Sequence, residues 1–190
     1  MEKKDLKPAG VFKYFEEICQ VPRPSKKEEK IIAYLKAFGV KHNLETNVDE
    51  AGNVLIKKPA TPGKENLQTV ILQSHIDMVC EKNNDVQHDF LTDPIETEID
   101  GEWLKAKGTT LGADNGIGVA TELAILADDS IEHGPLECLF TVDEETGLTG
   151  AFELKEGFMS GDILLNLDSE DEGEIFIGCA GGIDSVAEFS

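Results

Sequence analysis

Apolar residues recur along the 190-residue chain with two different periods, and the change of period separates predicted helices from predicted strands. The helical spacing of apolar residues in 11–19 predicts an amphipathic helix over residues 8–20, which the prolines after it end. Ser25 followed by Glu28 is a capping-box pattern and predicts the start of a second helix. Gly39 is the expected end of that helix.

Beyond residue 40 the apolar residues form short runs that are typical of strands. Two hairpins are predicted, from residues 45–48 with 54–57 and from residues 97–99 with 103–105 around Asp100-Gly101. Near-continuous apolar runs predict three buried strands, at residues 69–72, 136–142 and 163–167. A helix is expected to open at residues 112–118, and a further strand at residues 174–178. Alternating buried strands and helices predict an α/β fold of three layers, with a mixed sheet between helices.

Each of the three predicted buried strands ends in residues that can bind a metal or move a proton. His75 and Asp77 follow the first strand, Glu144 and Glu145 the second, and Asp168 the third. Ligands of open α/β sheets bind at the carboxyl ends of the strands, so these side chains are expected to share one cleft. The alternative for each, taken alone, is a solvated polar group at a strand end.

Asp114 lies in the glycine-rich segment 111–118, at the expected start of a helix. An Asp in that place can simply cap the helix and complement its dipole. The flanking glycines favour a close approach of the backbone or unusual dihedral angles, which a cap does not need. The segment matches neither the dinucleotide-binding nor the phosphate-loop pattern, which argues against a nucleotide site.

The composition is ordinary for a globular protein except in its charge. There are 17 Lys and Arg against 38 Asp and Glu, which leaves a net charge of −21. Such a surface repels nucleic acid and anionic membranes, so neither is an expected partner. The charged start of the chain does not resemble a signal peptide, and no apolar run is long enough to span a bilayer. The four cysteines are scattered, which argues against disulfides and makes the cytoplasm the expected compartment.

Taken in order, four segments resemble the M20 metallopeptidase family, and most closely its aminoacyl-histidine dipeptidase branch (Xaa-His dipeptidases, carnosinase-like enzymes). The opening of the chain at residues 18–25 also looks like that branch. The four segments are Ser74-His75-Ile76-Asp77-Met78-Val79, residues 108–118 around Asp114, residues 141–147 around Glu144-Glu145, and Asn166-Leu167-Asp168-Ser169-Glu170.

The resemblance implies a centre that holds two Zn²⁺ ions, with Co²⁺ or Mn²⁺ as alternative metals. Asp114 would bridge the two ions. His75 and Asp168 would complete one site, and Glu145 would bind the other ion. Zinc commonly takes histidine nitrogen and carboxylate oxygen as ligands, so these residue types suit it.

The resemblance also implies roles for two catalytic residues. Asp77 would orient His75, and Glu144 would act as the general acid and base in hydrolysis of the peptide bond of a dipeptide. The peptide bond between Asp114 and Asn115 is expected to be cis, as is frequent in the family.

Family members are more than twice as long as this chain, and a lid domain interrupts their catalytic domain. The resemblance therefore implies that residues 1–173 are the N-terminal part of the catalytic domain and that residues 174–190 begin the lid or its junction, where the chain stops. The parent protein would form a homodimer through the lid, and a later segment would supply one more histidine ligand. Two alternatives stay open: a metal-binding fragment with little or no catalysis, and a related amino-acid N-deacylase.

Overall fold

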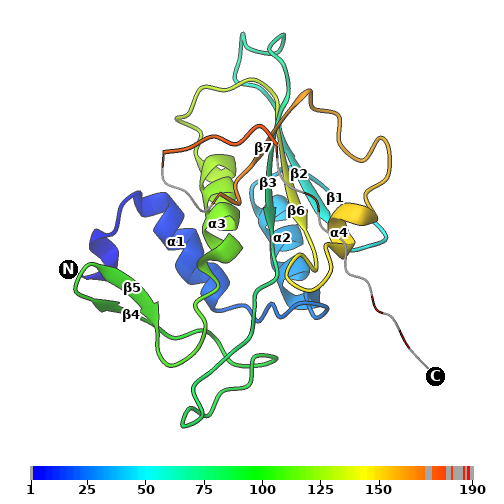
Figure 1. Cartoon of the computed structure of the whole chain (residues 1–190). Coiled ribbons are helices and arrows are strands. Elements are labelled where there is room, and N and C mark those ends of the chain that lie inside the picture. The colour runs from blue at the N-terminus through cyan, green and yellow to red at the C-terminus, as the bar shows by residue number, and fades with distance from the viewer. Residues whose placement is uncertain (1, 170–172, 179–180, 182–185, 187, 189–190) are drawn as a thin grey trace.

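A mixed five-stranded sheet organises the computed structural model, which describes residues 2–169, 173–178, 181, 186 and 188 (Figure 1). The strand order is β1-β2-β6-β3-β7. β1 and β2 run antiparallel to their neighbours, whereas β6, β3 and β7 are parallel to one another, so the last residues of these three lie at one edge. The bounds are β1 Glu45–Val48, β2 Val54–Lys58, β3 Val70–His75, β6 Leu136–Thr141 and β7 Ile163–Asn166. The predicted α/β class with a mixed sheet is confirmed.

Three helices form the main core with one face of this sheet. They are α1 Ala9–Cys19, α2 Glu29–Lys41 and α3 Ala113–Ala127. α1 packs along α3, where a Cβ on Gly10 would lie in ordinary contact, 3.5 Å from that of Ala124. The buried core includes Phe15, Ile18, Ile31, Leu35, Leu123, Val54, Ile56 and Phe140. The buried residues of α1 and of α2 each recur at helical spacing, so that each helix buries one apolar face. Burial of that face explains why both segments are helical.

Two predictions about α2 are wrong in detail. Gly39 does not end the helix, which continues to Lys41; a Cβ on Gly39 would lie 1.9 Å from the Thr46 hydroxyl, so close packing against β1 accounts for the glycine. The capping box is also absent: the Ser25 hydroxyl donates to Asp77, and Glu28 accepts from the backbone N–H groups of Lys26 and Asp143. A tertiary partner therefore replaces the predicted local one for Ser25, and Glu28 gains a tertiary partner beside a local one.

The opposite face of the sheet has a smaller core. Leu55, Ile71 and Leu139 are buried there against apolar residues of segment 154–159, which follows the short helix α4 Thr149–Phe152. The prediction that residues 163–167 form a buried strand is wrong in its burial. β7 is an edge strand that pairs, among the described residues, with β3 alone, and its apolar side chains are 40–49% exposed.

The remaining elements lie outside the main sheet. β4 Thr97–Asp100 and β5 Trp103–Ala106 form the second predicted hairpin, although its turn residues are Gly101 and Glu102 rather than Asp100 and Gly101. A short 3-10 helix, η1 Lys3–Asp5, precedes α1. The strand predicted at residues 174–178 is not formed. Glu170 and Cys179 lie outside the described residues, and Cys19, Cys80 and Cys138 are free thiols.

None of the helices in the described part of the chain is long and apolar enough to cross a membrane. The predicted division of the chain between residues 173 and 174 stays a prediction.

Candidate metal centre

The register of the parallel strands brings His75 and Asp168 to the same level at the sheet edge. In β3 and β6, His75 pairs with Thr141, so the Asp143–Glu145 turn begins just beyond it. In β3 and β7, Gln73 pairs with Asn166, and Asp168 follows two residues later. Three separate strands thus deliver their terminal side chains to one place, as the pattern of strand ends predicts.

Asp114 reaches this place from the start of α3, where the backbone is irregular. Gly112 has a positive φ of 67°, and both Asp114 and Asn115 have non-helical dihedral angles. The peptide bond between Asp114 and Asn115 is cis, as expected. No side-chain capping hydrogen bond forms at this helix end. Instead the Asp114 Oδ1 atom lies 3.0 Å from Nε2 of His75, so the interpretation as a simple helix cap is wrong.

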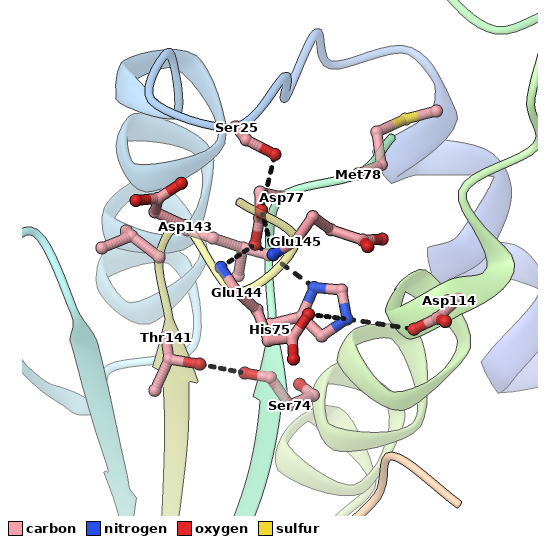
Figure 2. A network of polar contacts seen from close by, with 12 residues as sticks. Ser25, Ser74, His75, Asp77, Met78, Asp114, Thr141, Asp143, Glu144 and Glu145 are labelled. Atoms are coloured by element: carbon pink, nitrogen blue, oxygen red, sulfur yellow. Dashed lines mark hydrogen bonds and ion pairs between the residues drawn. The ribbon is translucent and has the colours of Figure 1, made fainter. Parts of the chain in front are cut away.

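The His75 ring lies at the centre of the site and is 1% exposed. Its Nδ1 atom lies 3.2 Å from Oδ1 of Asp77, while Nε2 faces Asp114 and Glu144 on the other side of the ring (Figure 2). Besides Asp114, Nε2 has Glu144 and Asp168 each at 3.9 Å. A carboxylate on Nδ1 places the proton of a neutral imidazole there and leaves Nε2 available as a ligand.

Three of the four predicted metal ligands can contact a single ion. Atoms of His75, Asp114 and Asp168 lie within 4.8 Å of one another, which makes them one of two such groups among the described residues. Glu145 is not in this group. Its side chain extends from the turn toward the side of His75 on which Asp114 lies (Figure 2). The role of Glu145 as ligand of a second ion stays a prediction.

Burial and crowding of negative charge raise the pKa of three carboxyl groups in this centre. Burial is the main cause for Glu144, Glu145 and Asp168 alike. Neighbouring carboxylates add to it: the charge of Asp168 acts on Glu144, and that of Asp114 acts on both Glu145 and Asp168. A cation placed among these groups would relieve the repulsion, so the donor set fits a divalent metal.

The pKa of His75 is shifted in the direction that this surplus of negative charge requires. Burial acts to lower it, but the carboxylates of Asp77, Asp114 and Asp168 outweigh burial and raise the pKa of His75 to about 9. Burial acts to raise the pKa of Asp77, yet its hydrogen bonds and His75 bring it down to about 2. Asp77 is therefore a fixed negative charge beside Nδ1 of the imidazole.

Asp77 also holds the turn that carries both glutamates. Its Oδ1 atom accepts a hydrogen bond from the Glu144 backbone N–H at 3.0 Å, and Oδ2 accepts one from that of Glu145 at 3.2 Å. Ser25 donates its hydroxyl to Oδ2 at 2.7 Å (Figure 2). One buried carboxylate thus fixes the orientation of His75 and the position of Glu144 and Glu145 together.

A second group of acids is buried and consists of Glu28, Asp77 and Asp143. Backbone N–H groups and hydroxyls satisfy these carboxylates: Glu28 accepts from the Asp143 N–H, and Asp143 accepts from the hydroxyls of Thr146 and Thr149. These donors explain how the acids tolerate burial, and they give the group a structural role. The sequence pattern missed Glu28 because it suggested a local cap.

Comparison with known proteins places this arrangement in a family. The model of "Peptidase family M20/M25/M40" matches residues 71–185. The cytosol non-specific dipeptidase of Escherichia coli is 53% identical over 183 residues, which are 96% of this chain and 38% of that protein. The chain therefore spans well under half the length of this relative.

Solved structures show the same fold. The aminoacylhistidine dipeptidase of Vibrio alginolyticus superposes with a TM-score of 0.91 at 55% identity, covering 94% of this chain and 36% of that one. The aminopeptidase PepT of Bacillus cereus gives a TM-score of 0.72 at 26% identity, covering 85% of this chain and 43% of that one. The mixed sheet flanked by helices is thus the catalytic-domain fold that the sequence resemblance implies.

Proposed function

Because the chain belongs to peptidase family M20/M25/M40, whose members depend on metal ions, we propose that it carries the metal-binding part of a dipeptidase. The proposed reaction is hydrolysis of the peptide bond of a dipeptide, with carnosine-like Xaa-His dipeptides as the first candidates. The single observation that carries the proposal is the convergence of His75, Asp114 and Asp168 within 4.8 Å. The names of the E. coli and Vibrio relatives, both dipeptidases, support the choice of substrate class.

The residues of the centre suit two Zn²⁺ ions, with Co²⁺ or Mn²⁺ as alternatives. His75, Asp114 and Asp168 would hold the first ion, and Asp114 with Glu145 would hold the second. When bound, such a pair polarises a substrate carbonyl and lowers the pKa of water. Surplus negative charge around His75 supports the presence of cations at this place.

Glu144 is the proposed general base and acid. Its Oε2 atom lies 3.9 Å from His75 Nε2, so its carboxylate borders the space in which the ligands converge. In the proposed mechanism, Glu144 takes a proton from the attacking water and passes it to the leaving amine. Burial and neighbouring charge raise its pKa, which brings the group nearer to the range that suits a base at neutral pH. Asp77 keeps His75 and the glutamate turn in place during both transfers.

For the 190-residue chain by itself we propose metal binding with little turnover. The observation that favours this is the number of ligands: three for the first ion but two for the second, while the chain covers 38% of the E. coli relative. The relative's name refers to the cytosol, and we propose the same compartment here. Dimerisation of the parent protein through a lid domain also remains a proposal.

The Glu144→Gln variant tests the catalytic role. In the parent protein, we expect this variant to retain its metal, measured by elemental analysis, and to lose nearly all dipeptide hydrolysis. Glu156→Gln is a suitable control because this exposed side chain lies outside the centre. Retained hydrolysis in Glu144→Gln would remove Glu144 from the role of base. Absence of any metal-dependent peptide hydrolysis in the unmodified parent protein would overturn the proposed function, whereas little turnover in the 190-residue chain is the expected result.

A further inference from the structure

A buried arginine connects the two segments that carry His75 and Asp114. Arg23, in the loop between α1 and α2, is 3% exposed. Its Nη1 atom donates hydrogen bonds to the carbonyl oxygens of Ile76 at 3.1 Å and Asp77 at 3.0 Å. Its Nη2 atom donates to the carbonyl oxygen of Gly112. One planar group therefore links the residues directly after His75 to the backbone two residues before Asp114.

The glycines of the 111–118 segment leave room for this guanidinium. A Cβ on Gly112 would lie 2.5 Å from Nη2 of Arg23, and a Cβ on Gly116 would lie 2.6 Å from the same atom. Real Cβ atoms do not approach other atoms so closely, so both positions require glycine while Arg23 stays in place. The glycine-rich pattern around Asp114 is thus explained by an arginine about 90 residues earlier in the chain.

The charge of Arg23 has no direct carboxylate partner among the described residues, where its guanidinium donates to the backbone carbonyls of Ile76, Asp77 and Gly112. A buried cation of this kind needs nearby negative charge. The acids of the centre supply it, and the charges of Asp77 and Glu145 act on Arg23. Arginine suits the place better than lysine, since its flat fork can donate in several fixed directions at once.

The same loop reaches the third segment of the centre. The Met78 N–H donates to the Arg23 carbonyl at 3.2 Å, which continues the contact with the end of β3. Ser25 donates its hydroxyl to Asp77, and Glu28 accepts the Asp143 N–H at 3.0 Å, just before the two glutamates. The loop is therefore in contact with all three of the segments that carry His75, Asp114 and Glu144.

We propose that Arg23 is a positioning residue, which sets the separation of His75 and Asp114 and thereby the affinity of the centre for its metal. This inference rests on the proposed metal site. Arg23 itself does not contact the ion or the substrate. Loss of the guanidinium group would let the start of α3 shift relative to the end of β3 while the fold persists.

The test measures metal affinity and the metal's spectrum in the 190-residue chain. Co²⁺ serves as the probe, because its visible absorption reports the ligand geometry. We expect Arg23→Lys to weaken Co²⁺ binding by about 10- to 100-fold, as is usual when a group that orients metal ligands is lost. The visible spectrum should change as well, while the far-ultraviolet circular dichroism of the metal-free chain stays the same.

Lys58→Met is the matched control. Lys58 is also a buried cation, 8% exposed, and it also donates to backbone carbonyls, those of Ile125 at 3.1 Å and Asp128 at 2.8 Å. These carbonyls lie at the opposite end of α3 from Asp114. We expect Lys58→Met to lower stability and leave the affinity for Co²⁺ and its spectrum unchanged.

Gly116→Ala provides a second variant in case Arg23→Lys does not fold. Alanine favours a helix more than glycine does, yet its Cβ would displace the guanidinium. We expect weaker Co²⁺ binding here too. If the unmodified chain binds Co²⁺ and both folded variants bind it equally well, the role of Arg23 is refuted and the metal site stands. If the unmodified chain binds no Co²⁺, the proposed site itself is refuted.

Discussion

Glu122 is a fully buried acid that should make the stability of this protein fall as the pH rises. It lies on α3 and is 0% exposed. Ser74, next to His75 on β3, donates its hydroxyl to Oε1 of Glu122 at 2.7 Å, whereas Oε2 has no partner among the described residues. Burial raises the pKa of Glu122 to about 8, although the hydrogen bond from Ser74 acts in the opposite direction. The folded protein therefore holds this side chain as a neutral acid at neutral pH.

The size of the pH-dependent change in the free energy of unfolding follows from the difference between this pKa and the ordinary value of 4.5. Because the folded-state pKa is the higher one, the associated stability is fully present below pH 4.5 and is lost as the pH rises toward 8. By pH 7 the loss amounts to about 3 kcal/mol, of which about 2 to 3 kcal/mol falls between pH 5 and pH 7. Glu122→Gln cannot ionise and should escape this loss, so its free energy of unfolding should rise relative to the unmodified chain over that interval.

Urea denaturation of both proteins at several pH values between 5 and 8 measures the effect. Glu137→Gln is the matched control, because Glu137 is equally buried at 2% exposure but paired, 3.2 Å from the Lys57 amine. Burial acts to raise the pKa of Glu137, but Ser160 and Lys57 hold it below 4.5. The ionised Glu137 side chain therefore stabilises the fold above that pH. Glu137→Gln should become less stable relative to the unmodified chain on going from acid to neutral solution. Parallel stability curves for Glu122→Gln and the unmodified chain would refute the reasoning.

Three further predictions concern the metal, the packing and the edge of the sheet. Because the pKa of His75 is raised to about 9, this side chain is protonated at pH 7 and Zn²⁺ must displace its proton on binding. Calorimetry in buffers of different ionisation enthalpy should therefore show about one proton released per ion, and absence of proton release would contradict this. Gly150→Ala should destabilise the fold by about 1–3 kcal/mol in urea, because its Cβ would lie 2.5 Å from the carbonyl oxygen of Val142. Gly147→Ala, whose Cβ would meet nothing nearer than 3.6 Å, should change stability little, and equal losses in the two variants would count against the packing argument. Because β7 exposes apolar side chains at an edge of the sheet, we expect the chain to self-associate through this edge. Leu164→Lys, at a leucine that is 48% exposed, should therefore reduce self-association in sedimentation velocity, and an unchanged distribution would show that this edge is not the contact.

The sequence alone determined the elements whose signal is local. Apolar residues at helical spacing predicted α1 and α2, and near-continuous apolar runs predicted β3 and β6, because burial of a stripe or of a whole strand leaves its period in the chain. The polar residues after the strands then pointed to His75, Glu144 and Asp168. That inference holds because parallel strands end at the same sheet edge, and this does not depend on how the other elements pack.

The tertiary structure alone decided which partners each polar group has. Ser25 and Glu28 match a capping box, yet they bond to Asp77 and to Asp143, which lies 115 positions further along the chain. The exposure of β7 likewise depends on what packs beside it, and its apolar run carries no sign of that.

Arg23 and Glu122 show the same limit most clearly. Nothing in the residues next to them indicates a guanidinium that links two ligand-bearing segments or an acid held neutral in the core. A local pattern records which face of an element is apolar, because that property repeats every few residues. The partner of a buried charge depends on segments that meet only after the chain has folded, and its pKa follows from that meeting.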